Sequence, residues 1–190
     1  MTLRDRQDRL LRATEHGRVA LLAAIGERMF PIYEKHWVGD HAVEVSRTIE
    51  QGWRRATGLD VPAADLVASR TQLQALVEFY NEESIGILAQ CTTLALRLVQ
   101  CLEASTEEEA VLAAARGTGN HLSAATLADR AIHDAKAPGF PAEAEEQAWQ
   151  ARALERLETW RAPIERHMFS DLGPLPPAWW PAYEAARHPI

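Results

Sequence analysis

Two pairs of polar residues have the types and spacing that a functional site requires. Glu27 and Arg28 are adjacent and lie among apolar residues, and Asp129 and His133 are four residues apart, which places them on one helix face. Glu27 and Arg28 suit a site carboxylate with a guanidinium anchor, or a charged hydrogen bond that braces a neighbouring helix. Asp129 and His133 suit a metal site or a simple surface pair. These four are the candidate pocket residues.

A metal site at Asp129 and His133 would need further ligands. His121 is the nearest candidate, but it lies about 80° around the helix from Asp129 at about 100° per residue. The sequence contains no Glu-x-x-His pair and identifies no second ligand-bearing helix. We therefore expect neither a metal nor a cofactor.

Sequence motifs of catalysis are missing. The chain has no Gly-x-Ser-x-Gly elbow, and Gly117-Thr118-Gly119 lacks the lysine and the preceding strand of a phosphate loop. Cys91 and Cys101 have no histidine close by in the sequence. This pattern favours binding over catalysis.

Acidic residues and tryptophans in the last third of the chain are candidates for contact with a partner. The carboxylates would pair with a basic partner, or simply keep the surface solvated. The two tryptophans, set among prolines, would anchor an interface or fold back over the core of the same domain. The candidate partner-binding residues are Glu143, Glu145, Glu146, Asp171, Trp179 and Trp180.

The elements that must position these residues are helices. Apolar residues recur at helical spacing through most of the chain, and alanine and leucine dominate the composition. We predict an all-α, irregular bundle of about six or seven helices over residues 1–169. A Pro/Trp-rich extension, 170–190, would pack on or near this single domain and hold one helical turn near 182–187. The nearly uninterrupted apolar stripe from Ile85 to Val99 predicts a central helix.

Capping residues and helix breakers predict where these helices begin and end. The expected starts are Thr2, Arg18, Gly39-Asp40, Asp60-Val61-Pro62, Asn81, a Ser105–Glu108 capping box, and Ala142. The expected stops are His16-Gly17, Gly58 and the break at 136–141, with the last helix running to Phe169. Pro31 should kink or end the second helix, and Gly117 with Gly119 should kink or split the sixth.

Charge and cysteine content restrict the partners and the compartment. The net charge is −7, and residues 61–190 carry 10 Lys/Arg against 18 Asp/Glu, so nucleic acid is not an expected partner. The two cysteines would be too far apart on one helix to form a disulfide, which suggests a reducing compartment. No signal peptide or membrane-spanning run is present. We expect a cytoplasmic protein, either monomeric or homodimeric.

The run GERMFPIYEKH (26–36), followed by Gly39-Asp40 and by Ile49 to Trp53, resembles the YjaG-like family of small bacterial proteins. The resemblance is best over 19–60 and implies an all-helical fold, but it brings no activity, cofactor or site residue. The helical layout also resembles bacterial immunity proteins, which neutralise toxins by direct binding. The functional hypothesis is therefore a non-enzymatic immunity protein that binds a basic toxin domain. The alternatives are a small helical enzyme, or a metal- or ligand-binding protein, with a pocket between helices.

Overall fold

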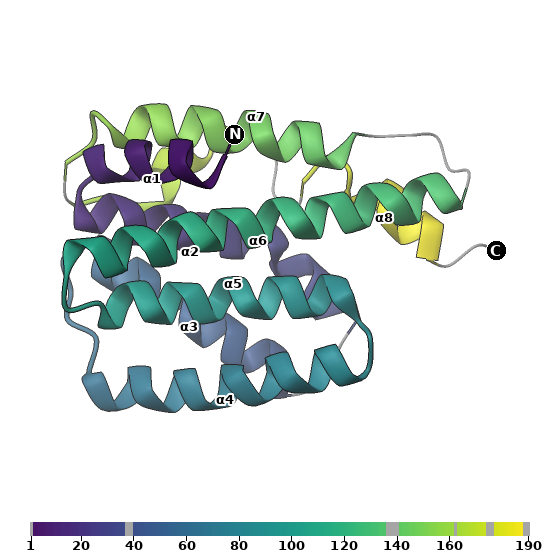
Figure 1. Ribbon diagram of the computed structural model, residues 1–190, viewed down its shortest axis with the longest axis horizontal. Coiled ribbons are helices and arrows are strands. Elements are labelled where there is room, and N and C mark those ends of the chain that lie inside the picture. The colour runs from purple at the N-terminus through teal and green to yellow at the C-terminus, as the bar shows by residue number, and fades with distance from the viewer. Residues whose placement is uncertain (1, 37–39, 136–140, 162, 174–176, 188–190) are drawn as a thin grey trace.

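A computed structural model describes residues 2–36, 40–135, 141–161, 163–173 and 177–187. Within these ranges every regular element is helical, which confirms the predicted all-α bundle (Figure 1). The elements are α1 (Leu3–Arg12), α2 (Glu15–His36), α3 (Asp40–Ala56), α4 (Ala63–Glu82), α5 (Gly86–Glu103), α6 (Glu107–Asp134), α7 (Ala142–Leu157), the 3-10 helix η1 (Arg166–Phe169) and α8 (Trp180–Arg187). No helix in the described part of the chain is long and apolar enough to cross a membrane.

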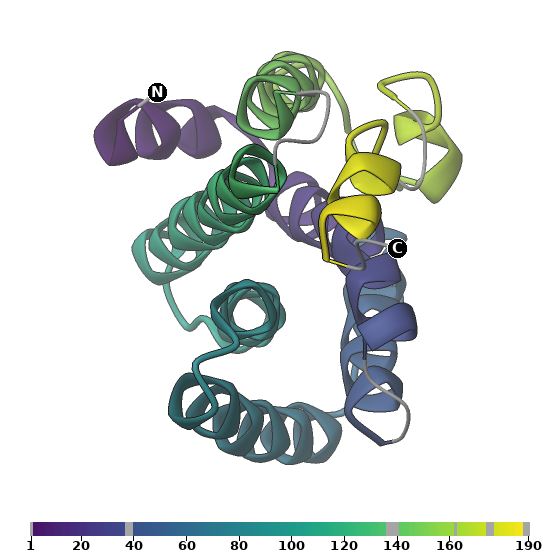
Figure 2. The same ribbon diagram turned by 90° about the vertical axis from the view of Figure 1, so that its right-hand side faces the viewer.

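Helix α5 lies at the centre of the bundle, as its apolar stripe predicts. It packs against α2, α3, α4 and α6, and Figure 2 shows these helices arranged around it. Most of its circumference is buried, with Leu88, Cys91, Leu94 and Leu98 among the enclosed residues. Both cysteines of the chain are buried thiols on this helix and are not bonded to each other.

Helix α6 runs without a break through Gly117 and Gly119, where a kink or split was expected. A Cβ placed on Gly117 would lie 2.6 Å from Leu22 Cδ2 of α2. A side chain at this position would require Leu22 to shift, so the glycine suits the close packing of α6 on α2, and this packing outweighs its low helix propensity.

Helix starts follow the predicted chemistry with small shifts. Thr2 forms a capping box with Asp5, which confirms the first N-cap. The second box is Thr106 with Glu109, one residue after the expected pair. Helix α2 begins at Glu15 because the Thr14 hydroxyl accepts the Gly17 backbone N–H at 3.1 Å. Predictions at 37–39 and 136–140 lie outside the described residues.

The observed helix ends differ from the predicted ones more than the starts do. His16 and Gly17 lie inside α2, which also continues through Pro31 to His36. Helix α4 extends past Asn81 to Glu82, and Ser84, with φ of 57°, separates it from α5. The predicted helix 142–169 instead ends at Leu157.

After α7 the chain crosses to the end of α3, and a backbone hydrogen bond holds it there. The backbone N–H of Ile164 donates to the carbonyl of Ala56 at the end of α3, 3.1 Å away. Arg166–Phe169 then forms η1, and Ile164 and Phe169 are buried. This crossing places η1 beside α2 and α3, where it forms one side of the site described next.

Candidate functional site

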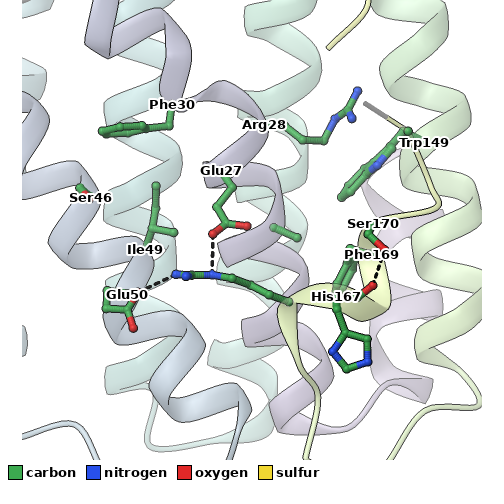
Figure 3. A pocket seen from close by; sticks show the side chains of 13 residues that line it. Glu27, Arg28, Phe30, Ser46, Ile49, Glu50, Trp149, His167, Phe169 and Ser170 are labelled. Atoms are coloured by element: carbon green, nitrogen blue, oxygen red, sulfur yellow. Dashed lines mark hydrogen bonds and ion pairs between the residues drawn. The ribbon is translucent and has the colours of Figure 1, made fainter. Parts of the chain in front are cut away.

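A hollow of about 690 Å³ lies between α2, α3, α7 and η1 (Figure 3). Phe30, Ile49, Trp149 and Phe169 supply apolar walls, and the remaining lining is largely polar or charged. A volume of this size lies within the range, about 300–1,000 Å³, of sites that hold small ligands or single side chains of a partner.

Three charged residues form the open side of this hollow, and we call them the rim cluster: Glu27, Glu50 and Arg166. Arg166 Nε lies 2.6 Å from Glu27 Oε1, and its Nη2 lies 2.6 Å from Glu50 Oε2. Its guanidinium carbon is also 5.7 Å from the ring centroid of Trp53. Figure 3 shows Glu27 and Glu50 converging on one group from two helices. The rim cluster is thus a guanidinium site with two carboxylates and an aromatic ring.

The two carboxylates share this one guanidinium. Burial raises the pKa of Glu27 above its usual value, and the charge of Arg166 offsets this only in part. Another cation at the hollow would therefore stabilise the ionised form of Glu27.

Behind the hollow lies a second set of charges, which we call the buried network: Arg28, His121, Glu146 and Trp179. Arg28 Nη2 and Nε donate to the two oxygens of Glu146 at 2.7 and 3.1 Å. The Trp179 indole N–H donates to Glu146 Oε1 at 2.9 Å, and His121 Nε2 lies 2.9 Å from Oε2. Glu146 thus joins α2, α6 and α7 to the start of the C-terminal segment.

The two opposite charges at the centre of the buried network are almost completely enclosed, so each needs the other as a partner. The side chains of Arg28 and Glu146 are 1% and 0% exposed. Burial opposes ionisation of Glu146, but His121 and Arg28 outweigh it and lower the pKa of this carboxyl to about 2. Gln150 completes the cluster, since its amide Nε2 lies 2.8 Å from His121 Nδ1.

The candidate pocket residues do not form one site. Glu27 and Arg28 line the hollow, where Arg28 has the bracing role that was one of its two interpretations. Asp129 instead caps α7, because its carboxylate accepts the backbone N–H groups of Ala142 and Glu143 at 2.6 and 2.9 Å. His133 is 91% exposed and lies beside Asp134. Of the four candidate pocket residues, Asp129 and His133 therefore do not line this hollow.

Metal-ligand geometry gives no support for a site at these residues. Within the described ranges there is no group of three or more His, Cys, Asp or Glu side chains suited to a metal ion.

The structure corrects half of the predicted partner-binding set. Glu146, Trp179 and Trp180 are buried, so a partner cannot reach them on the folded protein. The tryptophans cover the core of their own domain, because their rings pack on each other and on Tyr183. The two tryptophans therefore fold back over their own domain, which was the second of the two roles considered for them, and do not anchor an interface.

The remaining acidic candidates are held by neighbours within the chain. Glu143 accepts from the Thr126 hydroxyl at 2.9 Å, and Glu145 lies 3.2 Å from Arg28. Asp171 is exposed and pairs with Arg156. Of the predicted acidic contacts, Asp171 is the most accessible.

Four residues of the site were not assigned to it from the sequence: Glu50, Trp53, Arg166 and His121. Glu50 and Trp53 are three residues apart, a spacing that places both on one side of α3. Nothing in the sequence links them to Arg166, which is 116 residues from Glu50.

No protein-family model, curated protein or solved structure matches this chain. The functional argument therefore rests on the chemistry of the hollow.

Proposed function

We propose that this protein is a non-enzymatic binding module that receives a basic side chain of a protein partner at the hollow. In its most specific form, it is a cytoplasmic bacterial immunity protein that neutralises a toxin by direct binding. The observation that carries the proposal is the rim cluster, which already holds a guanidinium between Glu27 and Glu50.

The rim cluster has capacity for an additional cation. Arg166 carries one positive charge for two carboxylates, and Glu27 and Arg166 are 25% and 51% exposed. An arginine or lysine of a partner would join Arg166 or displace it, and would relieve the unfavourable ionisation of Glu27. The charge that the partner supplies is thus complementary to the charge that the hollow leaves uncompensated.

The walls of the hollow suit the rest of such a side chain. Trp149, Phe169 and Phe30 offer apolar surface beside the charged rim. Arginine and lysine bury their aliphatic stems on surfaces of this kind while their charged heads reach polar groups. Toxins that act on nucleic acids present basic residues at their active sites, so a plug at such residues would block them.

A second candidate function is the binding of a small cationic ligand in the same hollow. The volume of about 690 Å³ supports it. Catalysis has weaker support, because the Ser170 hydroxyl donates to the backbone carbonyl of His167 at 2.6 Å rather than to the imidazole ring.

The proposal is tested first with a probe pair that differs only in charge. Titration with N-acetyl-arginine amide should shift the indole N–H resonances of Trp53 and Trp149 in a saturable manner. N-acetyl-citrulline amide, which has nearly the same shape and no charge, should bind at least about ten-fold more weakly. Equal affinities for the two probes would contradict the proposal that the hollow selects a positively charged side chain.

The partner itself is tested by affinity capture from the native bacterium, with the affinity of the identified protein then measured by calorimetry. The double variant E27Q/E50Q should lose at least about ten-fold in affinity, since two charged hydrogen bonds disappear. E155Q, an exposed carboxylate on α7, is the matched control and should bind like the natural protein. An unchanged affinity in E27Q/E50Q would refute the proposal, and a captured toxin would establish the immunity role.

A further inference from the structure

A second cavity of about 400 Å³ adjoins the hollow, and we call it the side hollow. The two cavities share three lining residues, Glu50 of α3 and Arg166 and His167 of η1, so they meet between these two elements. Figure 3 shows Glu50 and His167 at the lower edge of the hollow. Beyond the shared residues the side hollow is lined by Trp53 and Leu59, among others. The site is therefore longer than the hollow alone.

Arg166 lies at the boundary between the two cavities. Its Nε and Nη2 contact Glu27 and Glu50 of the rim cluster, and its guanidinium carbon is 5.7 Å from the ring centroid of Trp53. Glu27 lines the hollow and not the side hollow, whereas Trp53 lines the side hollow and not the hollow. The acidic part of the site and its aromatic part are therefore separated by about one guanidinium group.

The side hollow offers a ligand apolar surface more than charge. Two of its charged groups already contact other groups of the chain: His167 Nδ1 lies 3.1 Å from Glu165 Oε2, and Arg54 Nη2 donates to the backbone carbonyl of Asp60 at 3.3 Å. Leu59, in contrast, is 56% exposed. A single exposed leucine is ordinary on a protein surface, but this one borders a cavity that continues into the rim cluster. An apolar side chain of a ligand would cover it.

We infer that the hollow and the side hollow form one groove for an extended segment of the protein partner, in which a basic residue and an apolar residue are two positions apart. The inference rests on the function proposed above and names the kind of partner segment. Residues i and i+2 of an extended chain lie on one side of it, about 7 Å apart. This spacing matches the short separation between the rim cluster and Trp53. The basic side chain enters the hollow, where the carboxylates of Glu27 and Glu50 complement its charge, and the apolar side chain covers Leu59.

Four short peptides test the groove. Acetyl-Arg-Gly-Leu-amide and the reversed acetyl-Leu-Gly-Arg-amide are each compared by calorimetry with a counterpart that has glycine in place of leucine. At least one leucine peptide should bind at least about ten-fold more tightly than its counterpart, because the leucine removes apolar surface from water in the side hollow. The order that binds more tightly gives the direction of the segment. Equal affinities within both pairs would overturn the inference and confine the ligand to the hollow, as expected for a small cation.

The same peptides distinguish failure of this inference from failure of the proposed function. If only the inference fails, the glycine peptides bind and leucine adds nothing. If the proposed function fails, none of the four peptides binds, and the inference is overturned with it.

The variant L59S assigns the gain from leucine to the side hollow. Leu59 is exposed, so L59S should fold. The gain should fall below about three-fold in L59S, while the glycine peptides keep their affinity. L11S is the matched control, because Leu11 of α1 has a similar exposure, 51%, and lines neither cavity. A full gain from leucine in L59S would overturn the inference.

Indole N–H resonances locate the two peptide side chains in the groove. Trp149 lines the hollow, and Trp53 lines the side hollow. The tighter leucine peptide should shift the Trp53 resonance further than its glycine counterpart does, and should shift the Trp149 resonance equally. A gain in affinity without the additional Trp53 shift would place the leucine outside the side hollow and would also overturn the inference.

Discussion

Glu27 and Arg28 are neighbours in the sequence, yet they belong to two different kinds of charge site. The Arg28 side chain is 1% exposed and joins the buried network, whereas Glu27 is 25% exposed and joins the rim cluster. Both sites consist of arginine and glutamate at hydrogen-bonding distance. They differ in burial and in how completely each charge is partnered.

The difference separates a structural ion pair from an exchangeable one. In the buried network three N–H groups of Arg28 and Trp179 donate to Glu146, and the buried His121 ring lies 2.9 Å from it. Removal of one partner there leaves a buried charge, which is costly. In the rim cluster solvent reaches Glu50 and Arg166, so a new partner can replace an old one at small cost.

The largest effect should come from E146Q, which keeps the shape of the side chain and removes its charge. Arg28 would then be buried without its main counter-charge, so the unfolding free energy should fall by about 3–5 kcal/mol. Urea denaturation followed by circular dichroism measures this. E145Q is the matched control, because Glu145 is adjacent, is 18% exposed and makes one longer contact with Arg28. It should cost about 1 kcal/mol. Equal losses in the two variants would contradict the special position of Glu146.

Acid should affect the two sites in opposite directions. The Glu146 pKa is lowered to about 2, so its stabilising contribution is present above the usual glutamate pKa and is lost as the pH falls from about 4.5 to 2. The shift corresponds to a loss on the order of 3 kcal/mol. The Glu27 pKa is raised, so its contribution is present below the usual pKa and is lost as the pH rises through the raised value.

Unfolding measured from pH 2 to 7 tests these signs with the variants. E146Q should abolish most of the acid loss, and E27Q should remove a decrease that begins near the usual glutamate pKa. If E27Q instead lowered stability most at neutral pH, the carboxylate would be a structural partner like Glu146.

A smaller effect is expected for D129A, which removes the cap of α7. Two backbone N–H groups lose their acceptor, so the unfolding free energy should fall by about 1 kcal/mol. D134A removes an exposed carboxylate of α6, the helix that also carries Asp129, and should leave stability unchanged within error. If D129A kept its fold but lost binding of the partner or the probe, Asp129 would have to contribute to binding as well as to the cap.

The smallest effect on stability should come from E50Q. Glu50 is 60% exposed, so its ion pair should contribute within about 0.5 kcal/mol, while binding of the arginine probe weakens. A variant that loses binding but keeps its stability would distinguish the rim cluster most clearly from the buried network. A loss of stability as large as that of E146Q would make the rim cluster a second structural network.

The helices were predictable because their signals are local. Apolar spacing identified α2, α3, α4 and α5, a capping box predicted α6 one residue early, and Thr2 was placed correctly as a cap. Two of the errors arose where a distant contact decided the outcome. The predicted helix 142–169 ends at Leu157 because Ile164 bonds to the end of α3, and α6 continues through Gly117 because α2 packs against it.

The candidate site was predictable only in part. Glu27 and Arg28 attract attention in the sequence because they are charged residues on an otherwise buried helix. Their partners lie more than 100 residues away, at Glu146 and Arg166. Trp179 had two interpretations in the sequence, and its hydrogen bond to Glu146 selected the buried one.

The sequence by itself determined the helical class, the central position of α5 and the charged pair on α2. Periodicity and capping are properties of neighbouring residues, so they can be read without knowing the fold. The tertiary structure alone decided which charge of that pair was enclosed and which was left at the surface. Burial and counter-charge depend on packing between distant helices, and the same two residue types become a buried brace or an exposed ion pair accordingly.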